Sequence, residues 1–171
     1  SGLATGFALQ PLLKFASEQR DDHKQLIGTA LFLNSIFIVG CSLLAYVLRA
    51  PAAKLLNAPV LADLLLYLPA MLLASFIRNF SLVLLQTRYR IQQVFWTDAV
   101  HFIGAVILVY VWSKLHLFDN AYDLVFINLI SLSSSSLVGL VFIRSFLIIA
   151  WKPQLEYVRL FWNYGKYVLG G

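Results

Sequence analysis

Long apolar runs that contain almost no charge dominate this sequence. A helix needs about 20 mainly apolar residues to cross roughly 30 Å of hydrocarbon. Four runs meet that requirement, at residues 26–48, 60–85, 94–112 and 124–150. Lipid offers the backbone no hydrogen-bond partners, and the runs lack the alternation of barrel strands, so they should be α-helices. The predicted fold class is all-α, a polytopic transmembrane helical bundle.

Two shorter apolar stretches flank these runs. Residues 3–15 and 164–171 are each too short to span a bilayer, and we interpret them as partial spans. The sequence starts at Ser1 and stops at Gly171 within apolar surroundings, and no basic segment with a cleavage site precedes the first stretch. We therefore expect a fragment, cut inside helices, with about four complete and two partial spans.

The composition supports a lipid environment. Hydrophobic residues make up 60% of the chain and charged residues 12%, whereas soluble domains carry about 25% charged residues. The net charge of +5 does not indicate a nucleic-acid partner, because the basic residues lie mostly in short breaks between apolar runs and form no dense cluster. Cys41 is the only cysteine and can form no intrachain disulfide. The expected partner is the lipid bilayer.

The distribution of Lys and Arg predicts the orientation of the chain, because basic residues are retained on the cytoplasmic side. We place the connections around Arg20, Arg88 and Lys152 in the cytoplasm, and those around Lys54 and Asp119 outside. Residues 153–163 mix charged and large apolar side chains. This cytoplasmic linker is either a short helix lying in the membrane interface or a segment that packs against protein.

Three stretches resemble a known family. They read QPLLKFASE at 10–18, LLQTRYR at 84–90 and FWNYGK at 161–166. With the order of elements, they resemble the first half of an oligosaccharide flippase, in the polysaccharide-export branch of the multidrug/oligosaccharidyl-lipid/polysaccharide exporter superfamily. Many members have a proline shortly after the glycine that opens the seventh helix, whereas Lys166 and Tyr167 follow Gly165 here.

The resemblance implies a fold and a function. The chain would run from the end of the second helix to the start of the seventh, within the N-terminal lobe of a two-lobed transporter. The protein would be a multi-pass protein of the bacterial cytoplasmic (inner) membrane and not an enzyme. It would flip a lipid-linked (polyprenyl-pyrophosphate) oligosaccharide outward for synthesis of surface polysaccharide such as the O-antigen of lipopolysaccharide.

Two arginines within apolar runs are candidate ligands for the pyrophosphate of such a substrate. Arg78 lies about 12 Å from the cytoplasmic end of its run and shares a helical stripe with Tyr67 and Ser75. Arg144 lies at a similar depth, with Ser133 on nearly the same face. Guanidinium groups bind phosphate through paired donors. The alternative is that both side chains snorkel to the inner headgroups.

Asp98 and His101 form a second candidate site. They are three residues apart near the cytoplasmic start of their run, so they share a helix face and could carry a coupling ion, H⁺ or Na⁺. The alternative is a helix-start carboxylate beside an interfacial histidine. The serines from Ser131 to Ser136 more often join helices by hydrogen bonds than bind a ligand.

Signals for an enzyme are poor. The three histidines lie in different regions without metal-ligand spacing, and no glycine-rich phosphate loop or serine elbow is present. We therefore predict no catalytic residues, no metal and no cofactor. Two alternatives to the flippase stay open. One is a cation-coupled multidrug antiporter of the same superfamily, which would need buried carboxylates, and the other is a non-transport membrane enzyme of envelope glycan assembly.

Overall fold

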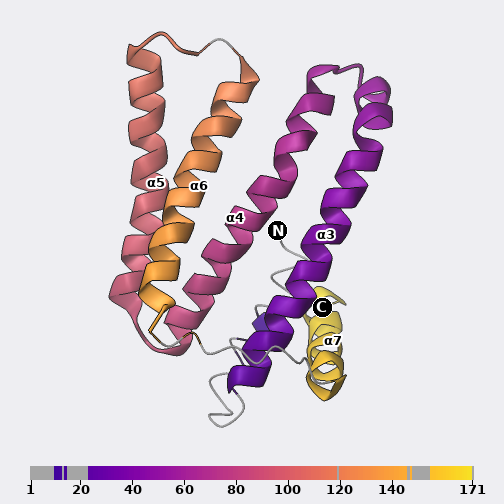
Figure 1. Ribbon diagram of the computed structural model, residues 1–171, viewed down its shortest axis with the longest axis vertical. Helices are drawn as coiled ribbons and strands as arrows, with labels where there is room; N and C mark the ends of the chain where they lie inside the picture. Colours follow the sequence, from indigo (N-terminus) through magenta and orange to yellow (C-terminus); the bar gives the residue numbers. More distant parts are fainter. Residues whose placement is uncertain are drawn as a thin grey trace.

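Every regular element in the described part of the chain is a helix. The computed structural model describes residues 10–12, 14, 23–118, 120–145, 147 and 155–170. Its main helices are α3 (His23–Leu55), α4 (Val60–Thr87), α5 (Ile91–Lys114), α6 (Ala121–Ile143) and α7 (Leu155–Gly170) (Figure 1). The predicted all-α class is confirmed.

Four of these helices, α3 to α6, are long and apolar enough to cross a membrane. The chain is therefore a multi-pass membrane protein. The runs predicted at 26–48, 60–85 and 94–112 lie inside α3, α4 and α5. The fourth run, predicted at 124–150, extends past α6, which ends at Ile143. The partial span at 3–15 lies mostly outside the described residues.

The turns between the helices are short. Each of the three contains one non-glycine residue with a left-handed backbone, namely Asn57, Tyr89 or His116. Helices commonly end this way, because a left-handed residue lets the next amides reach the last carbonyls. The proline in the sequence RAP at 49–51 does not end its helix, since α3 continues through Pro51 to Leu55. Pro51 is tolerated because only one backbone hydrogen bond is lost there.

The helices alternate in direction. In Figure 1, α4 lies between α3 and α6, and α5 lies on the far side of α6. The α3–α4 and α5–α6 connections lie at one end of the bundle. The α4–α5 turn, the start of α3 and helix α7 lie at the other. The connections around Arg88 and Lys54 thus lie at opposite ends of the bundle, which agrees with the predicted topology.

The apolar core lies near the end that holds the α4–α5 turn. There α3, α4, the end of α6 and α7 meet around buried side chains: Leu12, Leu26, Ile27, Ala30, Phe80, Leu84, Leu85, Ile143 and Phe161. Helix α7 is continuous across the predicted boundary between the linker 153–163 and the partial span 164–171. Phe161 is fully buried while its neighbour Trp162 is exposed, so α7 packs against protein through one face.

Candidate functional site

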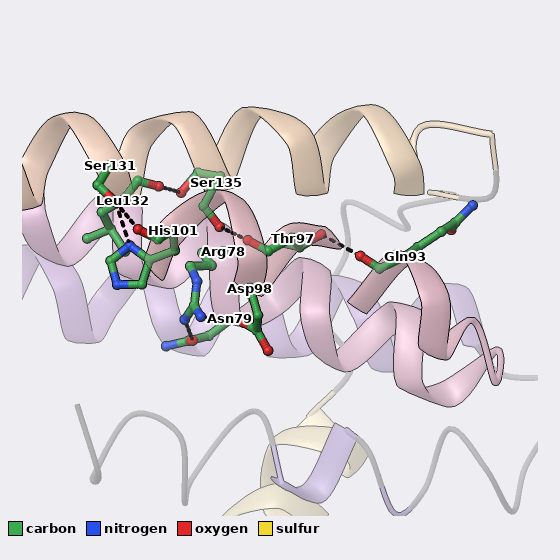
Figure 2. A network of polar contacts seen from close by, with 10 residues as sticks. Arg78, Asn79, Gln93, Thr97, Asp98, His101, Ser131, Leu132 and Ser135 are labelled. Carbon is green, nitrogen blue, oxygen red and sulfur yellow. Dashed lines mark hydrogen bonds and ion pairs between the residues drawn. The ribbon is translucent and has the colours of Figure 1, made fainter. Parts of the chain in front are cut away.

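An ion pair joins α4 and α5, the two helices of one hairpin, within their apolar membrane-spanning lengths. The Nη2 atom of Arg78 in α4 contacts the Oδ1 atom of Asp98 in α5 (Figure 2). The arginine side chain is only 14% exposed, whereas the aspartate side chain is 39% exposed. Arg78 also donates from Nη1 to Oδ1 of Asn79 over 3.3 Å. Arg78 from one predicted site and Asp98 from the other are therefore direct partners.

The hairpin geometry explains the pairing. Arg78 precedes the end of α4 at Thr87, and Asp98 follows the start of α5 at Ile91, by roughly 10–14 Å of helix in each case. Antiparallel helices bring residues at equal distances from their turn to the same depth. Charges within apolar helices are costly unless they are paired or hydrated. Pairing lowers that cost for both residues.

His101 extends the site one turn further along α5. Its Nδ1 atom lies 3.1 Å from the hydroxyl oxygen of Ser131 in α6, and that hydroxyl donates to the backbone carbonyl of His101. The hydroxyl of Ser131 thus contacts both the ring and the backbone of His101. This contact fixes the ring of His101 against α6 (Figure 2).

Serine hydroxyls hold α6 against both neighbouring helices. Ser135 donates to the carbonyl of Thr97 in α5 over 2.6 Å. Ser136 donates over 2.7 Å to the carbonyl of Ala74 in α4, and shares its proton with its own helix. Small polar residues serve this purpose in membranes because they allow helices to approach closely. Ser131, Ser135 and Ser136 therefore join helices as predicted, while Ser134 bonds its own helix. The ion pair lies beside this three-helix contact.

The serines proposed for substrate binding lie near this contact. Ser75 in α4 and Ser133 in α6 are both half-buried. Each is adjacent in sequence to a residue of the α4–α6 packing, Ala74 or Leu132, both of which are buried. Among the described contacts neither side chain joins the network of Figure 2, and their predicted role stays a prediction.

Tyr67 lies in a different place. It is about 16 Å along α4 from Arg78, towards the opposite end of the bundle. Its ring makes an edge contact with Phe126 of α6 at a centroid distance of 5.1 Å. With Asp63, Leu66 and Tyr122 it lines a cavity of about 540 Å³. Tyr122 donates from its hydroxyl to Oδ2 of Asp63 over 3.1 Å. Tyr67 and Arg78 share one face of α4, as predicted from their spacing, but they lie in two separate sites along that helix.

Arg144 is not inside a spanning helix. Helix α6 ends at Ile143, and Arg144 forms its C-cap with an exposed side chain. A cation is favourable at this position because the last carbonyls of a helix carry partial negative charge. The expectation that Arg144 lies as deep as Arg78 is therefore wrong, and its side chain is at the helix end.

The side chains of this site suit anion binding and proton transfer. A guanidinium, a carboxylate and an imidazole lie close together on α4 and α5, with hydroxyls from α6 beside them. Such groups can bind an anion and take up or release a proton. The described residues contain no group of three or more His, Cys, Asp or Glu side chains placed to hold a metal.

Sequence reasoning found the charged residues of the site but missed their pairing. The signal was present, because Arg78 and Asp98 lie at similar distances from the short TRYR turn at 87–90. Thr97 was also missed, since its contribution is a backbone carbonyl, which no side-chain pattern reveals. Comparisons of the chain with protein-family models, with curated proteins and with solved structures gave no match.

Proposed function

We propose that this chain is part of a transporter that flips a lipid-linked, polyprenyl-pyrophosphate oligosaccharide across the bacterial cytoplasmic membrane, for surface polysaccharide synthesis. The observation that carries the proposal is Arg78, a guanidinium only 14% exposed within helices long and apolar enough to cross a membrane. Intramembrane arginines are rare and mark pathways for ions or charged substrates.

The environment of Arg78 supports an anion-binding role. Its partner Asp98 is more exposed than the arginine, so the pair is open on the carboxylate side. The buried Nε–H of Arg78 has no acceptor among the described residues. A phosphate group presents several oxygens and suits the paired donors of a guanidinium.

The exposed apolar faces of the bundle are those expected if it forms one lobe of a larger transporter. Apolar side chains of α3 and α5 are well exposed, among them Val39 at 66% and Val106 at 68%. In a membrane protein such faces contact either lipid or further helices. A second lobe packed beside this one would enclose a cavity between the two.

The test is export of surface polysaccharide by full-length variants in a strain lacking the native gene. Arg78→Ala should abolish export, and Arg78→Lys should retain part of it because the charge is kept. Arg49→Ala is the matched control, since Arg49 stacks on the ring of Tyr46 at 4.6 Å and takes no part in the network of Figure 2. Normal export by Arg78→Ala, at wild-type abundance in the membrane, would contradict the proposal.

A second function is favoured by one observation. Asp98 is an intramembrane carboxylate, and a cation-coupled multidrug antiporter of the same superfamily requires one. Under this alternative, Asp98→Asn would raise drug accumulation in cells while Arg78→Ala left polysaccharide export unchanged. Parallel measurement of both readouts separates the two functions.

A further inference from the structure

The ion pair leaves Arg78 without spare charge for an anion. Three titratable or charged groups lie together in this part of the bundle: Arg78 from α4, and Asp98 and His101 from α5. Among the described residues, the α6 side chains bonded to α5 beside this group are those of Ser131 and Ser135, both hydroxyls. The positive charge of Arg78 is therefore already neutralised by the negative charge of Asp98.

The unpaired Nε–H of Arg78 is buried, so an anion reaches the guanidinium from the more exposed side, which Asp98 occupies, and must displace or share Asp98. In the ion pair, Asp98 engages only one guanidinium nitrogen, Nη2, through one oxygen. A phosphate that takes Nη2 forces the carboxylate of Asp98 away from its counter-charge. An unpaired carboxylate beside a bound anion at membrane depth is strongly disfavoured, because both repulsion and poor hydration oppose its charge.

We infer that Arg78 and Asp98 form an exchange site that binds a pyrophosphate anion and one proton together. The anion replaces Asp98 on the guanidinium, and the released carboxylate takes a proton from water and becomes a neutral acid. No covalent bond other than the new O–H is formed. On release of the anion, the acid returns the proton to water and the ion pair closes again.

Asp98 and not His101 is the group that must take the proton. The His101 ring is bonded through Nδ1 to Ser131 of α6, whereas Arg78 is bonded to Asp98 and Asn79. A proton on His101 would leave the charge of Asp98 on the guanidinium and would not free Arg78. Only neutralisation of Asp98 removes the competitor of the anion.

The inference rests on the proposed function for the identity of the anion, and it predicts a definite proton count. Binding linked to the uptake of one proton weakens roughly tenfold for each unit of rising pH, where Asp98 is ionised in the empty site. The direction follows from mass action: fewer protons favour the carboxylate, and the carboxylate competes for Arg78.

The experiment uses the purified full-length protein in lipid nanodiscs. The probe is dimethyl pyrophosphate, whose two acid groups stay ionised throughout the neutral range, so the probe itself does not titrate. Calorimetry in buffers of different ionisation enthalpy gives both the affinity and the protons taken up. We expect one proton per anion bound and a roughly tenfold loss of affinity per pH unit.

Two variants locate the proton. Asp98→Asn mimics the neutral acid with nearly the same shape, so it should bind the probe at least as tightly at the highest pH and take up no proton. His101→Gln should keep the pH slope, whatever its affinity. Because the calorimetry on the wild-type protein counts protons directly, the test does not depend on either variant folding.

Several results would overturn the inference: no binding by the wild-type protein, binding without proton uptake, a pH slope that persists in Asp98→Asn, or one that disappears in His101→Gln. The proposed function fails separately. If proton-linked binding holds but Arg78→Ala exports polysaccharide normally, the exchange site stands and the flippase does not. If Arg78→Ala abolishes export but the wild-type protein takes up no proton on binding, the flippase function stands and the exchange site does not.

Discussion

Gly139 of α6 packs directly against Ser81 of α4. A Cβ atom built on the glycine would lie 2.7 Å from the Cβ of Ser81 and 3.6 Å from Cγ2 of Thr97 in α5. Real Cβ atoms do not approach backbone-attached carbons so closely, and Ser81 is itself fully buried. Helices α4, α5 and α6 therefore meet at a point where only glycine fits.

Gly139→Ala should destabilise the bundle, by about 1–3 kcal/mol as expected for an overpacked contact. The physical reason is that α6 must move away from α4 to admit the methyl group. Thermal unfolding of the purified protein in detergent measures the effect. Gly40→Ala in α3 is the control, because a Cβ there meets nothing within 4 Å. Equal melting temperatures for the two variants would show that the close contact is absent.

Ser135→Ala should weaken the contact between α5 and α6 by roughly 1 kcal/mol, the usual value of an interhelical hydrogen bond in a membrane. The variant removes the donor to the Thr97 carbonyl. Ser134→Ala is the matched control, because Ser134 is exposed and donates to Ile130 of its own helix. A larger loss for Ser134→Ala than for Ser135→Ala, in the same unfolding assay, would argue against the arrangement of α6.

Asp98→Leu should destabilise the protein more than the double variant Arg78→Leu with Asp98→Leu. Removing one partner leaves a mostly buried guanidinium uncompensated, which costs about 1–3 kcal/mol, less than for a fully buried pair because the Asp98 side chain is 39% exposed. Removing both replaces the pair with apolar side chains suited to lipid. A double-mutant cycle on unfolding free energies measures the coupling. Additive effects of the two single variants would mean that the residues do not interact.

Phe161→Ala should release α7 from the bundle. The phenyl ring is fully buried in the core shared by α3, α4 and α6, and its loss leaves a cavity worth about 3 kcal/mol. Limited proteolysis should then cleave the segment around α7 faster than in the wild-type protein. The neighbouring Trp162 is 64% exposed, so Trp162→Ala should leave the cleavage rate nearly unchanged. Equal rates for both variants would contradict the docking of α7.

The helices themselves could be predicted from the sequence because in lipid a long apolar run has only one way to satisfy its backbone. Their ends were less certain. The predicted run 26–48 ended before Pro51, yet α3 continues through that proline. The predicted run 124–150 included Arg144, yet α6 ends one residue before it. Local composition does not decide such cases, because a helix end is set by the turn and the packing of its last residues.

The candidate site could be predicted residue by residue but not as a unit. Arg78, Asp98 and His101 stand out because charge is rare in these runs. Their meeting depends on the rotation of α4 and α5 about their axes, which follows from small contacts such as Gly139 on Ser81. Tyr67 shows the opposite case, since a shared helical stripe with Arg78 did not place it in the same site.

The most direct test of the account is a flipping assay with the purified full-length protein in liposomes. Labelled polyprenyl-pyrophosphoryl oligosaccharide is placed in one leaflet, and its arrival in the other leaflet is followed with a membrane-impermeant enzyme that modifies the sugar. The account predicts that the wild-type protein moves the lipid-linked sugar and that Arg78→Ala, at equal protein content, stays at the rate of empty liposomes. Transport by Arg78→Ala at the wild-type rate, or none by the wild-type protein, would contradict it.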